Sequence, residues 1–262
     1  MNYKILGNSP QTLVILSGSG VPFPTLEYEI LANLLSKTNT VIILEKFGYG
    51  FGGVTNSGRD VDTIINEYRA VMSKLNQNKP IILIAHSMGF IEALRWATLY
   101  PTEVSAIVGL DPATPEVYEH FNLNEAINGL KTLLENTEVQ KLYIEATLQS
   151  LPGTLNLDDY KKTLTANLQS KLWLAEALQL RQNIALVKAS PYPQIPTLFF
   201  ISNGGGTGLS TEVWQKGLTA YLQNINPSDY ILLDFAHNEL YKLAADEINN
   251  KINSFNTRKN IL

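Results

Sequence analysis

Three separated segments of the chain carry residue types that together could perform acyl transfer. Ser87 lies between small residues at positions 85 and 89, residues 17–20 alternate serine and glycine, and His237 lies near the C-terminus. A serine hydroxyl is a poor nucleophile until a base accepts its proton, so a reactive serine needs a histidine within hydrogen-bond reach. Acyl transfer also needs donors directed at the oxyanion that develops. The three segments therefore indicate a nucleophile, a general base and an oxyanion site.

The pattern around Ser87 predicts a sharp turn between a strand and a helix. Residues 80–85 are apolar and rich in branched side chains, which indicates a buried parallel strand, and residues 90–100 have helical spacing. A serine at such a corner occupies a strained turn that lifts its hydroxyl above the sheet, and small residues two positions to either side let the turn close. Ala85 and Gly89 meet this need. The alternative is that Ser87 only caps the helix, a common position for serine.

Of the three histidines, His237 is the best candidate for the base. It follows a predicted strand and precedes the last helix, so it is expected at the sheet edge that also carries Ser87. Its alternative role is that of a capping or surface residue. His86 neighbours the serine, and at a tight turn its side chain should point away, as a packing or polar-support residue. His120 is expected at the surface, with a substrate contact as the alternative.

The serine and glycine segment is expected to supply the oxyanion donors. Residues 13–16 form a buried strand that leads into it, and glycine lets backbone amides approach a ligand without a Cβ in the way. The predicted donors are the backbone N–H groups of Ser19 and of Met88, the residue after the nucleophile. A simple glycine-rich turn is the alternative.

Composition excludes several other classes of function. The chain has 262 residues, is 45% hydrophobic, and can bury one large core or a core plus an insertion. A net charge of -4 without a basic run argues against nucleic-acid binding. No apolar stretch approaches the roughly 20 residues of a membrane span, and the polar start does not resemble a signal peptide, so a cytoplasmic location is expected. With no cysteine and three histidines, we expect no multi-ligand zinc site. The oligomeric state stays open.

Strands and helices alternate through residue 111, which predicts an α/β fold: a mostly parallel sheet flanked by helices. The predicted strands are residues 12–16, 40–44, 81–85, 105–110, 197–201 and 230–233, and the predicted helices before residue 111 are 26–36, 61–75 and 88–100.

Residues 112–195 break this alternation and predict an all-helical cap inserted into a core of residues 1–111 and 196–262. Apolar residues recur at helical spacing in several runs of this segment. A helical insertion between two strands would lie over their carboxyl ends, where open α/β sheets bind ligands. The alternative is a plain helical subdomain that buries only its own apolar faces. Four aromatic residues either line a pocket there or pack in a core: Tyr118, Phe121, Tyr143 and Trp173.

The combination of segments resembles the α/β-hydrolase fold superfamily, in particular its small bacterial esterase-like members with a helical cap. Residues 16–20 stand where the family often has His-Gly-x-Gly, residues 45–52 where it has an acidic residue followed by Gly-x-Gly, and residues 85–89 at the nucleophile turn. The resemblance spans nearly the whole chain except the cap. It implies a catalytic acid between Ser87 and His237 in the chain.

The expected acid is displaced relative to that family. Its usual place follows strand 197–201, but no carboxylate occurs there before Glu212, and the glycine run 204–208 lacks the following Lys-Ser/Thr of a nucleotide loop. Some members carry the acid at the end of the preceding strand, which corresponds to Asp111. We therefore predict that Asp111 orients His237, with an Asx-turn role as its alternative and with Asp234 and Glu45 as other candidate acids.

A serine at the turn excludes the aspartate nucleophile of dehalogenases and epoxide hydrolases of this fold. The resemblance and the residues together predict a serine hydrolase that cleaves a small or medium apolar carboxylic ester through an acyl-enzyme, without metal or cofactor. Two alternatives stay open because a fold does not fix the chemistry. One is a ligand-binding or sensory protein with little turnover, and the other is a cofactor-free lyase or acyltransferase that uses the same triad.

Overall fold

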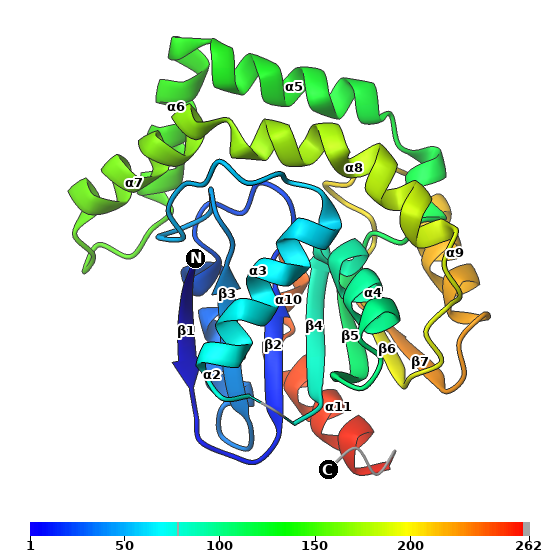
Figure 1. Ribbon diagram of the computed structural model, residues 1–262. Coiled ribbons are helices and arrows are strands. Elements are labelled where there is room, and N and C mark those ends of the chain that lie inside the picture. The colour runs from blue at the N-terminus through cyan, green and yellow to red at the C-terminus, as the bar shows by residue number, and fades with distance from the viewer. Residues whose placement is uncertain (78, 259–262) are drawn as a thin grey trace.

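A seven-stranded sheet forms the centre of the computed structural model, which describes residues 1–77 and 79–258 (Figure 1). The strand order is β1-β3-β2-β4-β5-β6-β7, and every neighbouring pair is parallel except β1 with β3. The strands are β1 (Asn2–Leu6), β2 (Thr12–Leu16), β3 (Thr40–Glu45), β4 (Ile81–Ser87), β5 (Val104–Pro112), β6 (Thr197–Ile201) and β7 (Ser228–Leu232).

Helices cover both faces of this sheet and one of its ends (Figure 1). They are α1 (Pro24–Glu27), α2 (Glu29–Leu35), α3 (Val61–Lys74), α4 (Gly89–Leu99), the 3₁₀ turn η1 (Val117–His120), α5 (Leu123–Glu135), α6 (Thr137–Gln149), α7 (Leu157–Ser170), α8 (Leu172–Lys188), α9 (Thr211–Leu222), α10 (Leu240–Leu243) and α11 (Ala245–Arg258). The predicted fold class, a mostly parallel sheet flanked by helices, is therefore confirmed.

The sequence prediction missed one strand and one break between two helices. The missed strand is β1, an antiparallel edge strand whose residues are alternately half-buried and exposed, so it lacks the continuous apolar run that marks the buried parallel strands. The predicted helix 26–36 is two helices, because Tyr28 has φ -97° and ψ 9° between α1 and α2. The Tyr28 side chain is fully buried there.

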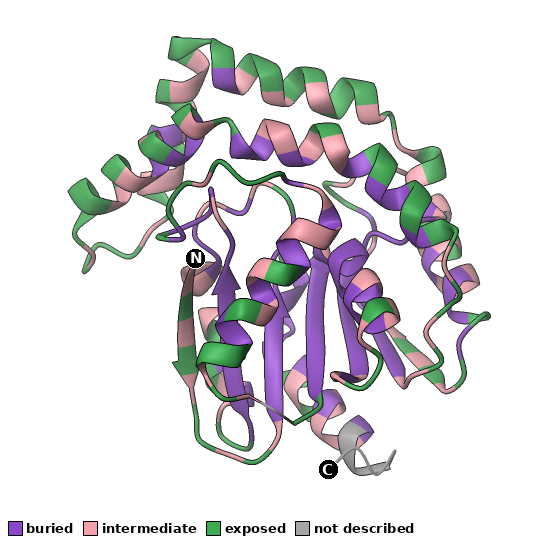
Figure 2. Cartoon of the chain, viewed as in Figure 1, coloured by how far each residue is buried: buried purple, intermediate pink, exposed green. Residues whose placement is uncertain are grey.

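The side chains of the central strands alternate between two hydrophobic clusters, one on each face of the sheet. Figure 2 shows these strands coloured as buried. On one face Val14 and Leu16 of β2 share a cluster with buried residues of α3, α4 and α9. On the other face Leu13 and Ile15 share a cluster with residues of α2, α10 and α11. Burial of both faces explains why these strands read as uninterrupted apolar runs.

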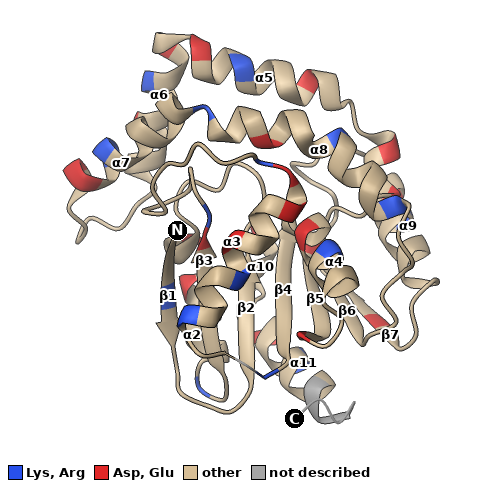
Figure 3. Ribbon diagram, viewed as in Figure 1, with Lys and Arg blue, Asp and Glu red and all other residues tan. Residues whose placement is uncertain are grey.

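Helices α5 to α8 form a layer across the end of the sheet at which β4 and β5 finish (Figure 1). Helix α8 packs on the sheet domain, since Leu180 and Ile184 belong to the same cluster as α3 and α4. A smaller cluster joins this layer to the sheet domain, because it includes Trp173 of α8 and also Tyr49 of the loop after β3. Acidic and basic residues are interspersed along the helices of both layers (Figure 3), and no helix of the described residues is both long and apolar enough to span a membrane.

Candidate active site

Ser87 occupies a strained turn between β4 and α4. Its φ is 51°, in the left-handed region that non-glycine residues seldom adopt. A Cβ on Gly89 would lie 2.8 Å from the carbonyl oxygens of Leu16 and Ser17, so only glycine lets the start of α4 approach the end of β2 this closely. The turn therefore has the local geometry that the small residues around Ser87 predict.

The imidazole of His237 lies beside this serine. Its Nε2 is 2.9 Å from Ser87 Oγ, and the residue is 8% exposed. His237 lies in the loop after β7 and is held by the loop after β6, because its backbone N–H donates to the carbonyl of Gly205 at 2.8 Å. The glycine run thus supports the histidine through its backbone.

Asp111 completes a chain of hydrogen bonds from the opposite side of the imidazole. It lies at the end of β5 with φ 48°, is fully buried, and its Oδ2 is 2.5 Å from His237 Nδ1. Its Oδ1 accepts from the backbone N–H of Ser202 at 2.7 Å and from Trp214 Nε1 at 2.8 Å. Each oxygen of this carboxylate has a donor, which is the condition under which a buried charge is tolerated.

The segment 17–20 passes directly over the nucleophile. A Cβ on Gly18 would lie 2.8 Å from Ser87 Cβ, so the close approach requires glycine at this position. Ser19 and Met88, whose backbone N–H groups were predicted as oxyanion donors, both line the cavity that opens above Ser87.

This cavity has a volume of about 310 Å³ and lies between the sheet edge and the helical layer. Its polar lining comes from Ser19, Ser87, His86, His237, Gly206, Thr207 and Asn238. Mostly apolar groups come from η1 and the residue after it, and from α5, α8 and α9: Tyr118, Phe121, Leu123, Ala126, Ile127, Leu130, Ala177, Leu180 and Trp214. No Lys, Arg, Asp or Glu lines it among the described residues. Burial raises the pKa of Tyr118, so its phenol stays neutral.

Comparison with known proteins identifies the family. A family profile described as alpha/beta hydrolase fold matches residues 16–205. The chain belongs to this family.

Solved structures of the α/β-hydrolase fold superpose on nearly the whole chain. A thermophilic esterase from Thermogutta terrifontis has a TM-score of 0.71 at 15% identity, covering 98% of this chain and 93% of the esterase. The enol-lactonase from Burkholderia xenovorans LB400 gives 0.68 at 15%, covering 98% and 96%. A haloalkane dehalogenase loop variant from Bradyrhizobium elkanii gives 0.73 at 15%, covering 98% and 94%. At these identities the likeness establishes the fold.

A curated relative matches a shorter stretch. The uncharacterized protein YbdG of Bacillus subtilis (strain 168) is 36% identical over 124 residues, which is 47% of this chain. The chain matches only 38% of the length of that relative.

The other carboxylates considered for this α/β-hydrolase site serve elsewhere. Asp234 is exposed and accepts from Asn203 Nδ2 at 3.0 Å. Glu45 is buried and accepts from Thr25 and from the backbone N–H of Phe51 at 2.8 Å, which fixes the loop after β3. In the described part of the chain, neither hydrogen-bonds to His237.

Of the other aromatic and histidine residues that the sequence singled out, some line the cavity and others lie in a hydrophobic cluster or at the surface. Tyr118 and Phe121 line the cavity, whereas Trp173 belongs to the smaller cluster that joins the helical layer to the sheet domain, and Tyr143 packs against that cluster. His120 is exposed on η1, as expected for a surface residue. His86 is buried and hydrogen-bonded, as expected for a polar-support residue.

Sequence reasoning missed the two groups that hold Asp111. Trp214 lies on α9 and Ser202 follows β6, and neither belongs to a motif with fixed spacing from Asp111. Ser202 stands where the family usually carries its acid, and that coincidence is the one sequence signal that could have linked it to the site.

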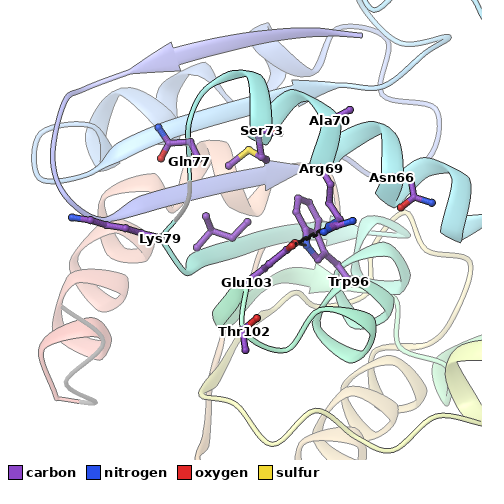
Figure 4. A pocket seen from close by; sticks show the side chains of 11 residues that line it. Asn66, Arg69, Ala70, Ser73, Gln77, Lys79, Trp96, Thr102 and Glu103 are labelled. Atoms are coloured by element: carbon purple, nitrogen blue, oxygen red, sulfur yellow. Dashed lines mark hydrogen bonds and ion pairs between the residues drawn. The ribbon is translucent and has the colours of Figure 1, made fainter.

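A second hollow of about 720 Å³ lies between α3 and α4 near the start of β4 (Figure 4). Its lining is polar, and Arg69 within it is bound by both oxygens of Glu103 at 2.7–3.1 Å. Arg69 also stacks on Tyr100, with the guanidinium 3.4 Å from the ring centroid. No histidine lines this hollow among the described residues, so the arrangement of a nucleophile with its base belongs to the cavity above Ser87.

Proposed function

We propose that this α/β-hydrolase-family protein is a serine hydrolase that cleaves a neutral, apolar carboxylic ester. The observation that carries the proposal is the continuous hydrogen-bond chain from Ser87 through His237 to Asp111, which opens into an apolar cavity. A serine paired with a base, itself oriented by a buried acid, is the arrangement that nucleophilic catalysis needs.

The proposed reaction proceeds in two halves. In the first, Ser87 Oγ attacks the ester carbonyl while His237 Nε2 accepts the hydroxyl proton and then delivers it to the leaving alcohol. Asp111 stabilises the imidazolium, and the backbone N–H groups of Ser19 and Met88 bind the oxyanion. In the second half, water activated by His237 attacks the acyl-enzyme, so that the acid leaves and Ser87 is restored.

The cavity lining supports a small or medium, uncharged acyl group. A volume of about 310 Å³ is at the lower end of the range for small-molecule sites, roughly 300–1,000 Å³. An ionic substrate would lose its hydration without meeting a charged partner among the described lining residues, because these carry no Lys, Arg, Asp or Glu.

Different segments of the chain would carry the reacting groups and select the substrate. Residues 1–111 and 196–262 would form the core that carries the reacting groups, and residues 112–195 would form the cap that selects the substrate. The apolar lining from η1, α5 and α8 supports this division.

The test is labelling of the purified protein with a fluorophosphonate probe, which reacts with activated serines, followed by an ester screen. Labelling of the wild type that disappears in Ser87→Ala, together with release of acid and alcohol from p-nitrophenyl butyrate, is the expected result. Absence of labelling in a correctly folded wild type would favour a binding protein. Labelling with transfer of the acyl group to an added alcohol, but not to water, would indicate an acyltransferase.

A further inference from the structure

His86 is a buried, titratable residue that the proposed reaction does not use. It precedes Ser87 in the chain and is 1% exposed. Its imidazole lies among three other rings, with centroids 6.0 Å from Tyr28, 4.8 Å from Tyr241 and 4.8 Å from His237. A polar ring enclosed in this way must satisfy both nitrogens inside the protein.

The hydrogen-bond partners of His86 fix which nitrogen carries the proton. Its Nε2 lies 3.3 Å from the backbone carbonyl oxygen of His237, and a carbonyl can only accept, so Nε2 must carry hydrogen. Burial is the main cause that lowers the pKa of His86 well below its ordinary value, so the ring holds a single proton. Nδ1 must then accept from the Tyr28 hydroxyl, 3.0 Å away.

The loop above the nucleophile packs against this hydrogen-bonded histidine. A Cβ on Gly18 would lie 3.0 Å from His86 Nδ1, so the loop lies directly on the imidazole. The hydrogen bonds run from Tyr28 through His86 to the backbone of His237, and the loop is held against His86 by packing.

We propose that His86 is a positioning residue, held as the neutral tautomer with hydrogen on Nε2, that keeps the loop 17–20 and the backbone of His237 in register around Ser87. The inference rests on the proposed function for its effect on rate, and on the burial and hydrogen-bond partners of His86 for the tautomer. A neutral His86 also avoids charge repulsion with His237, which acquires a positive charge in the proposed reaction. The two ring centroids are only 4.8 Å apart, so a second positive charge on His86 would oppose that step.

The tautomer is tested by ¹⁵N NMR of the histidine side chains in the wild-type protein, where three histidines give a simple spectrum. His86, assigned by loss of its signals in His86→Gln, should show a protonated Nε2 and an unprotonated Nδ1 that do not change between about pH 5 and pH 9. A protonated Nδ1, or titration near the ordinary histidine pKa, would overturn the proposal. This measurement needs no turnover, so it separates the proposal from a failure of the hydrolase function.

The positioning effect is tested by the rate of fluorophosphonate labelling and by kcat and KM for p-nitrophenyl butyrate. His86→Phe removes both hydrogen bonds and should lower kcat by about 100-fold, the cost of a misplacement near 1 Å, with little change in KM. His86→Gln keeps an N–H donor near Nε2 and should recover most of the rate, and Tyr28→Phe should lie between the two. Equal rates in His86→Phe and the wild type, or equal losses in the Phe and Gln variants, would contradict the positioning role.

Discussion

The carboxylate of Asp111 lies 2.5 Å from Nδ1 of His237, although 126 positions separate the two residues in the chain. Asp111 ends β5, and His237 follows β7 on the far side of β6. Between them, Ser202 follows β6 directly, donates its backbone N–H to Asp111 and carries no carboxylate of its own. The acid and the histidine therefore meet across a strand that contributes no charge.

Asp111→Asn should abolish most of the activity while leaving the fold intact. An amide in this place can donate to Nδ1, which stabilises the wrong tautomer of His237, and the loss of kcat expected for such a change is about 10⁴-fold. The matched control is Asp234→Asn, an exposed carboxylate near His237 in sequence, which should keep wild-type kcat. Hydrolysis of p-nitrophenyl butyrate measures both, and the reverse pattern would transfer the role of the acid to Asp234.

Trp214→Phe should loosen the hold on the Asp111 carboxylate, because it removes a hydrogen bond to the oxygen that does not face His237. The substitution removes the donor 2.8 Å from Asp111 Oδ1, and a hydrogen bond to a charged group contributes about 1.5–3 kcal/mol to the free energy of unfolding. We expect that loss in urea denaturation and a labelling rate about 10-fold lower, equivalent to about 1.4 kcal/mol in the barrier.

Trp173→Phe is the control for this change. It removes a hydrogen bond of 2.7 Å from Trp173 on α8 to the backbone carbonyl of Gly48, in the loop after β3. It should lower the free energy of unfolding without slowing the labelling of Ser87. Equal labelling rates in Trp214→Phe and the wild type would show that Asp111 does not need the indole.

Gly18→Ala should damage the site, whereas Gly129→Ala should not. A methyl group at Gly18 would lie 2.8 Å from Ser87 Cβ and 3.0 Å from His86 Nδ1, so the loop must move away from the nucleophile, with an expected loss in kcat of about 100-fold. A methyl group at Gly129, exposed on α5, meets no atom within 4 Å and should raise the free energy of unfolding by about 1 kcal/mol. Kinetics and urea denaturation of both variants provide the comparison.

The structural features that the sequence predicted best are those set by a local pattern of residues, such as buried strands and the turn at Ser87. Residues 12–16 and 197–201 are strands with the predicted bounds, because burial on both faces demands an unbroken apolar run. The turn at Ser87 was predictable for a similar reason, since small residues on either side of a strand-to-helix corner are a local requirement. The edge strand β1 was not predicted, because half-exposed edge positions accept polar and apolar residues alike.

Contacts that join distant segments were harder to predict. The separation between Trp214 and Asp111 is set by the packing of α9 against β6, which no residue spacing encodes. Tyr28 is another example, because its burial depends on the break between α1 and α2, where the sequence predicted one continuous helix. The catalytic roles of Ser87, His237, Asp111, Ser19 and Met88 stay predictions until the variants are measured.

Ala177→Phe should reduce the length of the acyl chain that the cavity accepts. Ala177 lies on α8 and lines the cavity, so a phenyl group there would fill much of its volume of about 310 Å³. We expect kcat/KM for p-nitrophenyl octanoate to fall far more than that for the acetate, because the shorter acyl group needs less of the cavity. Leu178→Phe, at an exposed position on the same helix, is the control and should leave the ratio unchanged. A parallel loss for both esters would place acyl recognition elsewhere.

A buried group of charges between the sheet domain and α8 is expected to make stability depend on pH. Lys46 is fully buried, and its Nζ lies 2.6 Å from Oε1 of Glu92 and 2.6 Å from Oε1 of Glu176. Tyr49 donates to the same Glu176 oxygen at 3.3 Å, while Glu176 Oε2 is buried without a hydrogen-bond partner in the described part of the chain. Burial is the main cause that raises the pKa of Glu176, with Glu92 adding to it and Lys46 and Arg59 opposing it.

Because the folded-state pKa of Glu176 is above its ordinary value of 4.5, the folded protein binds more protons than the unfolded chain above that pH. Its contribution to stability is therefore complete below pH 4.5 and is lost as the pH rises through the folded-state pKa. Glu176→Gln cannot ionise, so the free energy of unfolding of the wild type should fall relative to this variant as the pH rises. Urea denaturation from about pH 4 to pH 8 measures this difference, with Glu212→Gln, exposed on α9, as a control that stays parallel to the wild type. A difference that is flat or grows in favour of the wild type would mean that Lys46 keeps Glu176 ionised throughout.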